Sequence, residues 1–224
     1  MPARTEFTSE ERRAPVQRIL RGLDRAYPNA QCALAHTNAL ELLIATILSA
    51  QCTDERVNLV TRDLFRKYRA PADYVRVARE VLEKDIRSTG FYRNKAKSVQ
   101  GACQMILEKF AGKVPDTMEG LLELPGVARK TANVVLGVAY GKAEGIVVDT
   151  HVFRVSRRLD LTASETPENI ERDLMQIIPR DRWIAFSHQM ILHGRATCKA
   201  RKPLCPVCPV QTLCRSKDKT LPTK

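Results

Sequence analysis

Leu121 to Leu136 reads LLELPGVARKTANVVL, a pattern that predicts two helices joined by a tight turn at residues 124–128. Pro125 fixes one φ angle in that turn, and Gly126 permits a backbone conformation and a close approach that a Cβ atom would hinder. A turn that leads into a helix start presents backbone N–H groups without helical partners, and such groups bind phosphate. The segment therefore predicts a helical hairpin with a phosphate site.

Composition and charge limit the class of protein. With 224 residues, 44% hydrophobic and 28% charged, the chain can fold into one or two domains. Its net charge of +12 indicates a polyanionic partner, which on charge alone is RNA, DNA or an acidic membrane. No apolar run is long enough to span a membrane, and the opening MPARTEFTSEERR lacks the apolar core of a signal peptide. We therefore expect a cytoplasmic protein in a reducing environment, with no membrane association.

Apolar residues recur at helical spacing along almost the whole chain. Residues 40–48 are apolar nearly all round, as in a helix at the centre of a domain. The only extended run, Ile146 to Val148, is too short to found a sheet, so the predicted fold class is all-α. The residues expected to cap helix starts are Thr37, Asp54, Thr117, Asp149, Thr166 and Asp181, and helix ends are expected near Gly141 and Gly194.

Four cysteines are crowded into one short segment with the spacing Cys198-x6-Cys205-x2-Cys208-x5-Cys214. Disulfides are disfavoured in a reducing compartment, so the group predicts a tetrahedral metal site or an iron–sulfur cluster. The spacing does not separate these two. It slightly favours iron–sulfur, because zinc ribbons usually combine two distant Cys-x2-Cys pairs.

The same segment is basic, with eight lysines and arginines against one aspartate between residues 195 and 224. Most of this charge is typical of a solvated tail. Lys199, Arg201 and Lys202 differ because they lie between two cysteines and are held in a shaped loop. Such a loop loses less entropy on binding, which makes these residues candidate phosphate contacts.

Lys130 lies in the first turn of the second hairpin helix, next to Arg129. The helix dipole and the neighbouring cation both disfavour the charged amine, and a nucleophile needs the neutral form. A lysine nucleophile also needs a carboxylate that accepts a proton, for which Asp149 is the candidate. The alternatives are an ordinary surface lysine and an aspartate that only caps a helix.

Four features together closely resemble the endonuclease III family, the bifunctional DNA glycosylase/AP lyases of the helix-hairpin-helix superfamily. They are the hairpin LPGVARKTANVV, the phrase VDTHVFRVSRRL, the run HQMILHGRATCKARKPLC and the cysteine spacing, and the match extends from about Leu40 to Cys214. The resemblance implies two helical domains with a DNA-binding cleft between them. Residues 32–142 would form a six-helix barrel with the hairpin at about 117–140, and residues 1–31 with 143–224 would form an iron–sulfur domain.

The resemblance also implies the chemistry. Lys130 and Asp149 match the catalytic lysine and aspartate of the family, and Cys198, Cys205, Cys208 and Cys214 match the ligands of its 4Fe–4S cluster. The partner would be double-stranded DNA that contains a damaged pyrimidine or an abasic site. An oxidised pyrimidine is flipped out, the amine attacks C1′ to form a Schiff base, and β-elimination cuts the strand on the 3′ side. The protein would act as a monomer and, in a bacterium, at the nucleoid.

Two further positions carry over, and two depart from the family pattern. Gln51 matches the glutamine that fills the gap left by the flipped nucleotide, and Gly126 matches a hairpin glycine. Phe91 stands where the family often has a wedging leucine, and an aromatic ring can also wedge by stacking. Ala128 replaces a second hairpin glycine, so it would be strained if the site required a positive φ.

Two rival functions remain at this point. A monofunctional mismatch glycosylase of the same superfamily would share the hairpin and the cluster but lack a lysine at the position of Lys130. A non-enzymatic iron–sulfur DNA-binding protein would share the charge, the hairpin and the cysteines. In that second case the joint presence of Lys130 and Asp149 would be a coincidence.

Overall fold

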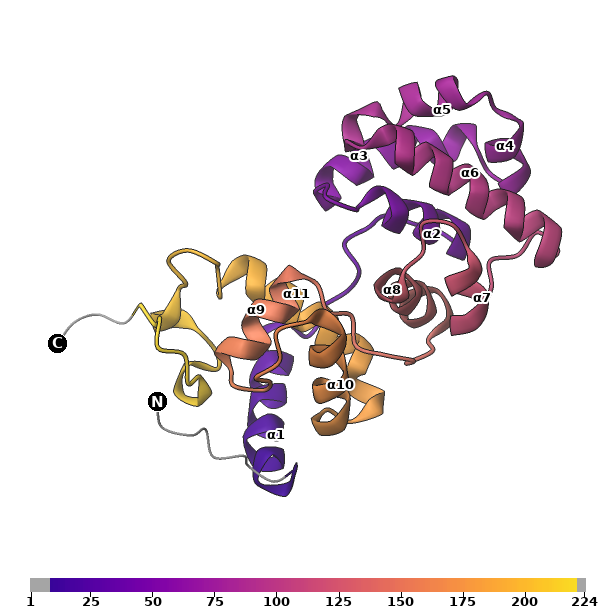
Figure 1. The fold of residues 1–224 in the computed structure, drawn as a ribbon. Helices are drawn as coiled ribbons and strands as arrows, with labels where there is room; N and C mark the ends of the chain where they lie inside the picture. Colours follow the sequence, from indigo (N-terminus) through magenta and orange to yellow (C-terminus); the bar gives the residue numbers. More distant parts are fainter. Residues whose placement is uncertain (1–8, 221–224) are drawn as a thin grey trace. The chain divides into compact units, whose positions relative to one another are not determined.

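The structure is a computed structural model that describes the backbone of residues 9–220 and side chains from residue 15 onward (Figure 1). Two parts of the chain that carry expectations from the sequence lie outside the described residues. They are the first eight residues, where no signal peptide is expected, and Lys224 of the basic segment. Within residues 9–220 the chain is helical and has no β-strand, which confirms the all-α prediction. Ile146 to Val148 is part of a connection without regular structure. No described helix is long and apolar enough to cross a membrane.

The chain divides into two compact units. Cys32–Glu144 is continuous and is called here the hairpin unit. Met1–Gln31 combines with Gly145–Lys224 in the second, called the cysteine unit.

The hairpin unit is built around α2 (Ala39–Leu48), whose residues from Leu42 to Leu48 are all buried. This helix packs against α6 and α8, so its apolar surface is covered on more than one side, as its composition predicts. The other elements of the unit are α3 (Asp54–Lys67), α4 (Pro71–Arg76), α5 (Arg79–Asp85), the 3-10 turn η1 (Arg87–Thr89), α6 (Tyr92–Lys109), α7 (Met118–Glu123) and α8 (Arg129–Tyr140).

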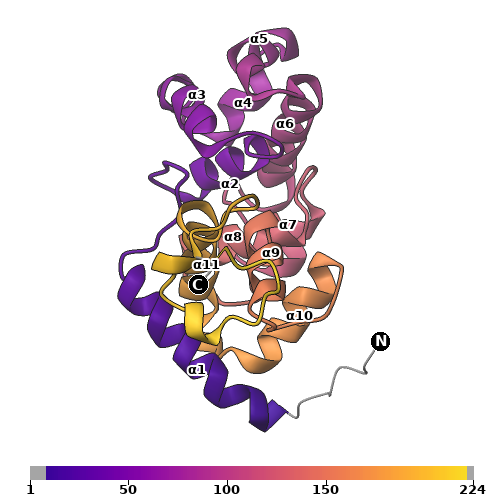
Figure 2. The same cartoon turned by 90° about the vertical axis from the view of Figure 1, so that its left-hand side faces the viewer.

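The cysteine unit joins the two ends of the sequence. Its elements are α1 (Ser9–Ala26), α9 (Thr150–Arg158), α10 (Pro167–Ile177), η2 (Arg180–Arg182), α11 (Trp183–Ala196), η3 (Cys205–Val207) and η4 (Gln211–Leu213). The apolar stripe of α1 is buried against α10 and α11, and η4 lies along the same helix (Figure 2). Gly22 permits that approach, because a Cβ atom there would lie 2.8 Å from Cγ1 of Val210.

Three of the expected helix caps are confirmed. The side chain of Thr117 accepts a hydrogen bond from the Gly120 amide, Asp149 caps α9, and Thr166 caps α10 directly before Pro167. The end of α8 at Gly141 is also confirmed, and Gly141 has the left-handed φ of 65° that favours glycine at this position.

Three other caps were predicted at the wrong residue. Asn38 caps α2, while Thr37 donates to the carboxylate of Glu41. Thr53 caps α3, so Asp54 is its first helical residue. Asp181 lies in the turn η2, and α11 begins at Trp183 and continues to Ala196, two residues beyond the predicted end at Gly194. In the first two cases two neighbouring residues can both act as caps, and sequence preference alone does not choose between them.

Candidate nucleic-acid interface and cluster site

The hairpin turn brings its backbone against α6. Gly126 has a φ of 79°, and a Cβ atom at this residue would lie 2.5 Å from Cβ of Ser98. Both the backbone conformation and the space therefore require glycine. The turn is held from inside by Leu124 and Val127, which are buried, while Pro125 and Gly126 are exposed.

Ala128 is not strained, contrary to the risk inferred from sequence. Its φ is −97° and its ψ is 170°, an extended conformation that any residue adopts. It is the residue before α8 and has no side-chain oxygen to cap the helix. The start of α8 thus lacks a side-chain cap, which suits it to an external anion.

Lys130 is exposed at the second position of α8, directly after this turn. Asp149 is half-buried at the start of α9, where its Oδ1 atom accepts hydrogen bonds from the amides of His151 (2.9 Å) and Val152 (2.8 Å). The two bonds fix the orientation of the carboxylate. Lys130 belongs to the hairpin unit and Asp149 to the cysteine unit.

Arg154 connects α9 to the segment that leads to the cysteines. It donates hydrogen bonds to the carbonyls of Gly194 (2.9 Å) and Cys198 (3.0 Å) and to Nδ1 of His151 (3.2 Å). Burial lowers the pKa of His151, which favours the neutral ring that accepts this bond. The helix that Asp149 caps is therefore fixed to the cysteine segment through its middle residue.

Gln51 and Phe91 are exposed non-glycine residues in the left-handed region, with φ values of 52° and 47°. Gln51 lies between α2 and α3, and Phe91 is the residue before α6. The Phe91 side chain is 64% exposed, unusually high for a large apolar group, and it lines an open hollow with Tyr92, Arg93 and Asn94. Strained backbone and exposure together are typical of residues kept for function.

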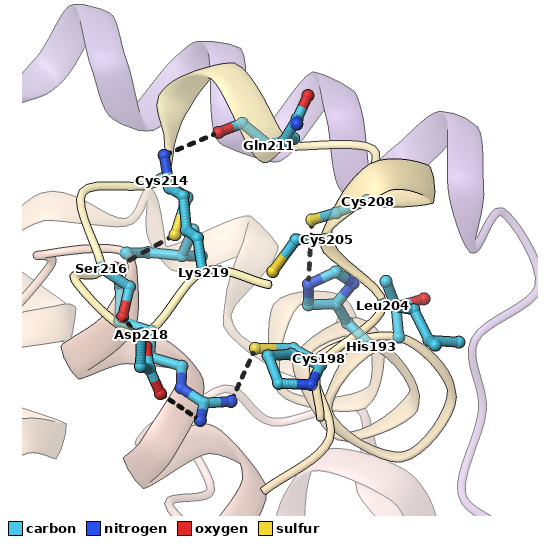
Figure 3. A pocket seen from close by; sticks show the side chains of 14 residues that line it. His193, Cys198, Leu204, Cys205, Cys208, Gln211, Cys214, Ser216, Asp218 and Lys219 are labelled. Atoms are coloured by element: carbon cyan, nitrogen blue, oxygen red, sulfur yellow. Dashed lines mark hydrogen bonds and ion pairs between the residues drawn. The ribbon is translucent and has the colours of Figure 1, made fainter. Parts of the chain in front are cut away.

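The four cysteines line one pocket, and their sulfur atoms face a common space (Figure 3). In the described part of the chain no three histidine, cysteine or acidic side chains lie close enough to hold a single metal ion. Four cysteine side chains around one pocket supply the thiolate ligands that an iron–sulfur cluster requires.

His193 lines the pocket and is hydrogen-bonded to Tyr27, which lies outside the lining. Nε2 of His193 lies 3.8 Å from Sγ of Cys208, and Nδ1 shares a hydrogen bond with the Tyr27 hydroxyl (3.1 Å). Burial, with Arg154 nearby, lowers the pKa of His193 to about 4, so the ring is neutral at pH 7. Tyr27 also bonds to Thr197 (3.0 Å), which ties the end of α1 to the segment before the first cysteine.

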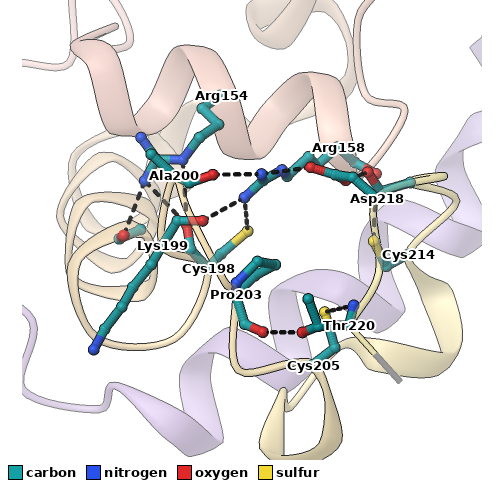
Figure 4. Close-up of polar contacts among 12 residues, drawn as sticks. Arg154, Arg158, Cys198, Lys199, Ala200, Pro203, Cys205, Cys214, Asp218 and Thr220 are labelled. Atoms are coloured by element: carbon teal, nitrogen blue, oxygen red, sulfur yellow. Dashed lines mark hydrogen bonds and ion pairs between the residues drawn. The ribbon is translucent and has the colours of Figure 1, made fainter. Parts of the chain in front are cut away.

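Arg158 fixes the first part of the loop between Cys198 and Cys205 (Figure 4). It donates to Sγ of Cys198 (3.4 Å), to the carbonyls of Lys199 (2.7 Å) and Ala200 (3.1 Å), and to the carboxylate of Asp218 (2.5 Å). The side chains of Lys199, Arg201 and Lys202 are all exposed, and that of Lys199 points away from this network. The basic loop is therefore shaped, as the sequence predicts.

Several residues that build these sites were missed from sequence. Arg154 and Arg158 carried a weak signal, because arginines four residues apart lie on one face of a helix. Lys95, whose ammonium group donates to the carbonyls of Leu48 and Thr89, carried a clearer one, since it lies four residues before Val99 on the apolar stripe of α6. Tyr27 carried none that separates it from an ordinary aromatic residue, whereas His193 was expected to have a structural hydrogen-bonding role, as its contact with Tyr27 shows.

Comparison with known proteins identifies the family. Residues 44–180 match the HhH-GPD superfamily of base excision DNA repair proteins, and residues 198–214 match the iron–sulfur binding domain of endonuclease III. The chain is 54% identical to endonuclease III of Synechocystis, an alignment that covers 94% of this chain and 95% of the relative. The chain belongs to the endonuclease III family. Endonuclease III of Bacillus subtilis is 48% identical over 86% of this chain and 88% of its own length.

Solved structures of endonuclease III agree with the fold. A trapped endonuclease III–DNA covalent intermediate matches with a TM-score of 0.87 and 48% identity, covering 94% of this chain and 97% of that one. A thermostable thymine-DNA glycosylase matches at 22% identity with a TM-score of 0.78, which shows a shared fold alone. As a member of the endonuclease III family, the chain is a base excision repair DNA glycosylase that carries a 4Fe–4S cluster. The non-enzymatic alternative is therefore wrong.

Replacing Gly126 with alanine tests the hairpin geometry. Gly126→Ala should lower the free energy of unfolding by about 1–3 kcal/mol, because the new Cβ meets Ser98 in a left-handed backbone. It should also weaken DNA binding, since the turn must shift. Urea unfolding and a DNA-binding titration measure the two effects. Gly141→Ala is the matched control: its φ is also positive but its Cβ would meet open space, so DNA binding should not change.

Proposed function

We propose that this chain is a bifunctional glycosylase and AP lyase that removes oxidised pyrimidines from double-stranded DNA, with Lys130 as the nucleophile. The observation that carries the proposal is the position of Lys130, exposed in the first turn of α8 directly after a turn that Gly126 and Ser98 constrain. The uncapped start of α8 would bind a DNA phosphate. Binding there places the DNA backbone beside the amine.

The reaction follows from the nature of the nucleophile. C1′ of a stacked nucleotide is inaccessible, so the damaged nucleotide must leave the stack first. The Lys130 amine then forms a bond to C1′ while the bond from C1′ to the base breaks. The attached nitrogen then loses a proton, and the C1′–O4′ bond breaks as O4′ takes up a proton, which opens the sugar and leaves a Schiff base between Lys130 and C1′. Removal of a C2′ proton then expels the 3′ phosphate by β-elimination, and water releases the lysine.

Asp149 is assigned the carboxylate role in this reaction. Both of its amide hydrogen bonds use Oδ1, so we assign Oδ2 to the proton released as Lys130 reacts. Its negative charge would also stabilise the cationic sugar as the base leaves. The cap and the catalytic role are compatible, because the cap orients the carboxylate.

Gln51 and Phe91 would occupy the space that the flipped nucleotide leaves. The Gln51 amide can bond to the base left without a partner, and the exposed Phe91 ring can stack between bases. The left-handed backbone at Gln51 and Phe91 is energetically unfavourable locally, and both side chains are exposed to solvent.

The four cysteines are the proposed ligands of the 4Fe–4S cluster. Once bound, the cluster would join η3 and η4 to the end of α11 and hold Lys199, Arg201 and Lys202 ready for the DNA backbone. We assign the cluster no step at the sugar. We further propose that the protein acts as a monomer in the cytoplasm, at the nucleoid, with residues 32–142 as a barrel domain and residues 1–31 with 143–224 as the cluster domain.

The remaining rival is a monofunctional mismatch glycosylase. That branch removes a base without a covalent intermediate and lacks a lysine at the position of Lys130. The presence of Lys130 in the exposed first turn of α8 favours the bifunctional reaction.

Borohydride trapping tests the nucleophile. Borohydride added during incubation with thymine-glycol DNA should reduce the Schiff base and leave a protein–DNA adduct. Lys130→Ala should abolish the adduct while the protein still binds the duplex. Lys113→Ala, which removes an exposed lysine elsewhere in the hairpin unit, should trap normally. An adduct of undiminished yield in Lys130→Ala would show that another amine is the nucleophile.

Replacing Asp149 with asparagine separates its two roles. Asparagine caps helices as well as aspartate does, so Asp149→Asn should keep the stability of α9. The single-turnover rate of base excision should nevertheless fall by about 100-fold or more, because the amide cannot accept the proton. Thermal unfolding and excision of thymine glycol measure the two effects. An unchanged rate would reduce Asp149 to a cap.

Visible absorbance tests the cluster ligands. The purified protein should show a broad absorbance that colourless zinc cannot give, and Cys205→Ser should lose most of it. The variant should also bind DNA more weakly, since Lys199, Arg201 and Lys202 lose the support of the cluster. Cys52→Ser, outside the cysteine segment, should keep the absorbance. Retained absorbance in Cys205→Ser would remove Cys205 from the ligand set.

A further inference from the structure

Lys95 is a cation in the core of the hairpin unit. Its side chain leaves the inner face of α6, among Ala96, Val99 and other buried residues, and the residue is only 5% exposed. Its ammonium group donates to two backbone carbonyls, those of Leu48 (2.8 Å) and Thr89 (2.7 Å).

Burial of this charge has a cost that packing alone does not explain. Desolvation lowers the pKa of Lys95, which shows that the site disfavours the ammonium form. Both acceptors are neutral carbonyls, and neither offers the compensation of a carboxylate. An apolar side chain of similar length would fill the same space without that penalty. The position of the two carbonyls in the chain explains why a buried ammonium group stands here.

Each carbonyl lies just before one of the two residues assigned to the DNA. Leu48 is the last residue of α2 and precedes Gln51 by three positions. Thr89 is the last residue of η1 and precedes Phe91 by two. The ammonium group thus bridges the ends of two helical turns, where the carbonyls carry the negative end of the helix dipole.

Phe91 is tied to Lys95 in a second way. The Lys95 amide donates to the Phe91 carbonyl (3.1 Å), which starts α6. Lys95 therefore makes three contacts with these segments. It binds the Phe91 backbone directly, the turn before Phe91 through the Thr89 carbonyl, and the end of α2 before Gln51 through the Leu48 carbonyl.

We propose that Lys95 is a positioning residue that holds the segments 49–53 and 87–91 in the one arrangement in which Gln51 and Phe91 enter the DNA together. This inference rests on the roles proposed above for those two residues. Both have left-handed backbones that would relax if their segments moved independently. Fixing them before DNA arrives removes the entropy cost of ordering two loops at the moment of base flipping.

The test measures insertion directly. Lys95→Met removes the charge and both donors but keeps an unbranched apolar side chain. The probe is 2-aminopurine placed opposite a stable abasic-site analogue in a duplex, since its fluorescence reports local unstacking. We expect the fluorescence rise of the wild-type complex to be largely lost, and single-turnover excision of thymine glycol to fall by about 10- to 100-fold. Affinity for undamaged duplex, which depends on the hairpin and the basic loop, should change less than about twofold.

Lys97→Met is the matched control. Lys97 is an exposed lysine two residues further along α6, so its loss removes the same charge from the same helix without touching either loop. It should keep the fluorescence rise. A Lys95→Met variant that keeps both the fluorescence rise and the excision rate overturns the proposal.

A mutant cycle shows whether Lys95 acts through the two side chains. In a background that carries Gln51→Ala and Phe91→Ala, Lys95→Met should cause little further loss of excision. Full additivity would overturn the proposal, because Lys95 would then act by another route. If the background itself loses nothing, the roles of Gln51 and Phe91 fail, and this inference fails with them.

Lys95→Arg covers the case in which Lys95→Met does not fold. The guanidinium group keeps the charge and several donors, so Lys95→Arg should recover part of the fluorescence rise and show the same non-additivity. If neither variant folds, Lys95 is required for the core and not for the loops, and the proposal is wrong.

Discussion

A cation that binds backbone carbonyls organises each of the two units. In the hairpin unit Lys95 joins the ends of α2 and η1. In the cysteine unit Arg154 and Arg158, half-buried on one helix, bind carbonyls from Gly194 to Ala200. Carbonyls at helix ends and in loops have no helical partner, so a fixed cation both satisfies them and sets the path of the chain. In both units the segment held in this way is one that we assign to DNA or to the cluster.

This arrangement suits a protein that acts on a stiff, highly charged substrate. Contact with DNA depends on exposed basic groups whose positions must match those of the phosphates. We assign this contact to the exposed residues Lys199, Arg201 and Lys202, whose loop Arg158 holds through the carbonyls of Lys199 and Ala200. The cations that shape the interface and the cations that face solvent are thus different residues.

Local sequence patterns correctly predicted those features that depend on a few neighbouring residues. The hairpin, the all-α class and the caps at Thr117, Asp149 and Thr166 depend on a few neighbouring residues, and the structure agrees with them. Cap residues with a competent neighbour were misplaced by one residue, as at Asp54. The backbone of Ala128 could not be predicted, because an N-cap needs no positive φ even where relatives have glycine.

Features set by tertiary contacts were out of reach. Nothing local in the sequence shows that Gln51 and Phe91 adopt left-handed conformations, since glycine at either position would have been the expected sign. The role of Lys95 depends on carbonyls 47 and six residues away in sequence, which no periodicity reveals. The cysteine spacing indicated a joint site, and the four side chains do line one pocket, but the choice of an iron–sulfur cluster over a single ion comes from the match of residues 198–214 to an iron–sulfur binding domain.

The discontinuous cysteine unit has a consequence for the order of folding. The hairpin unit is one continuous segment and can complete its core while the ribosome is still adding later residues. Helix α1 is made first, yet its apolar face is covered by α10 and α11, which are made near the end. Until α10 and α11 have been made, the apolar face of α1 lacks the helices that cover it in the folded unit. The four cysteines that we propose as cluster ligands lie farther still along the chain, in a unit to which α1 and the segment from Gly145 onward both contribute.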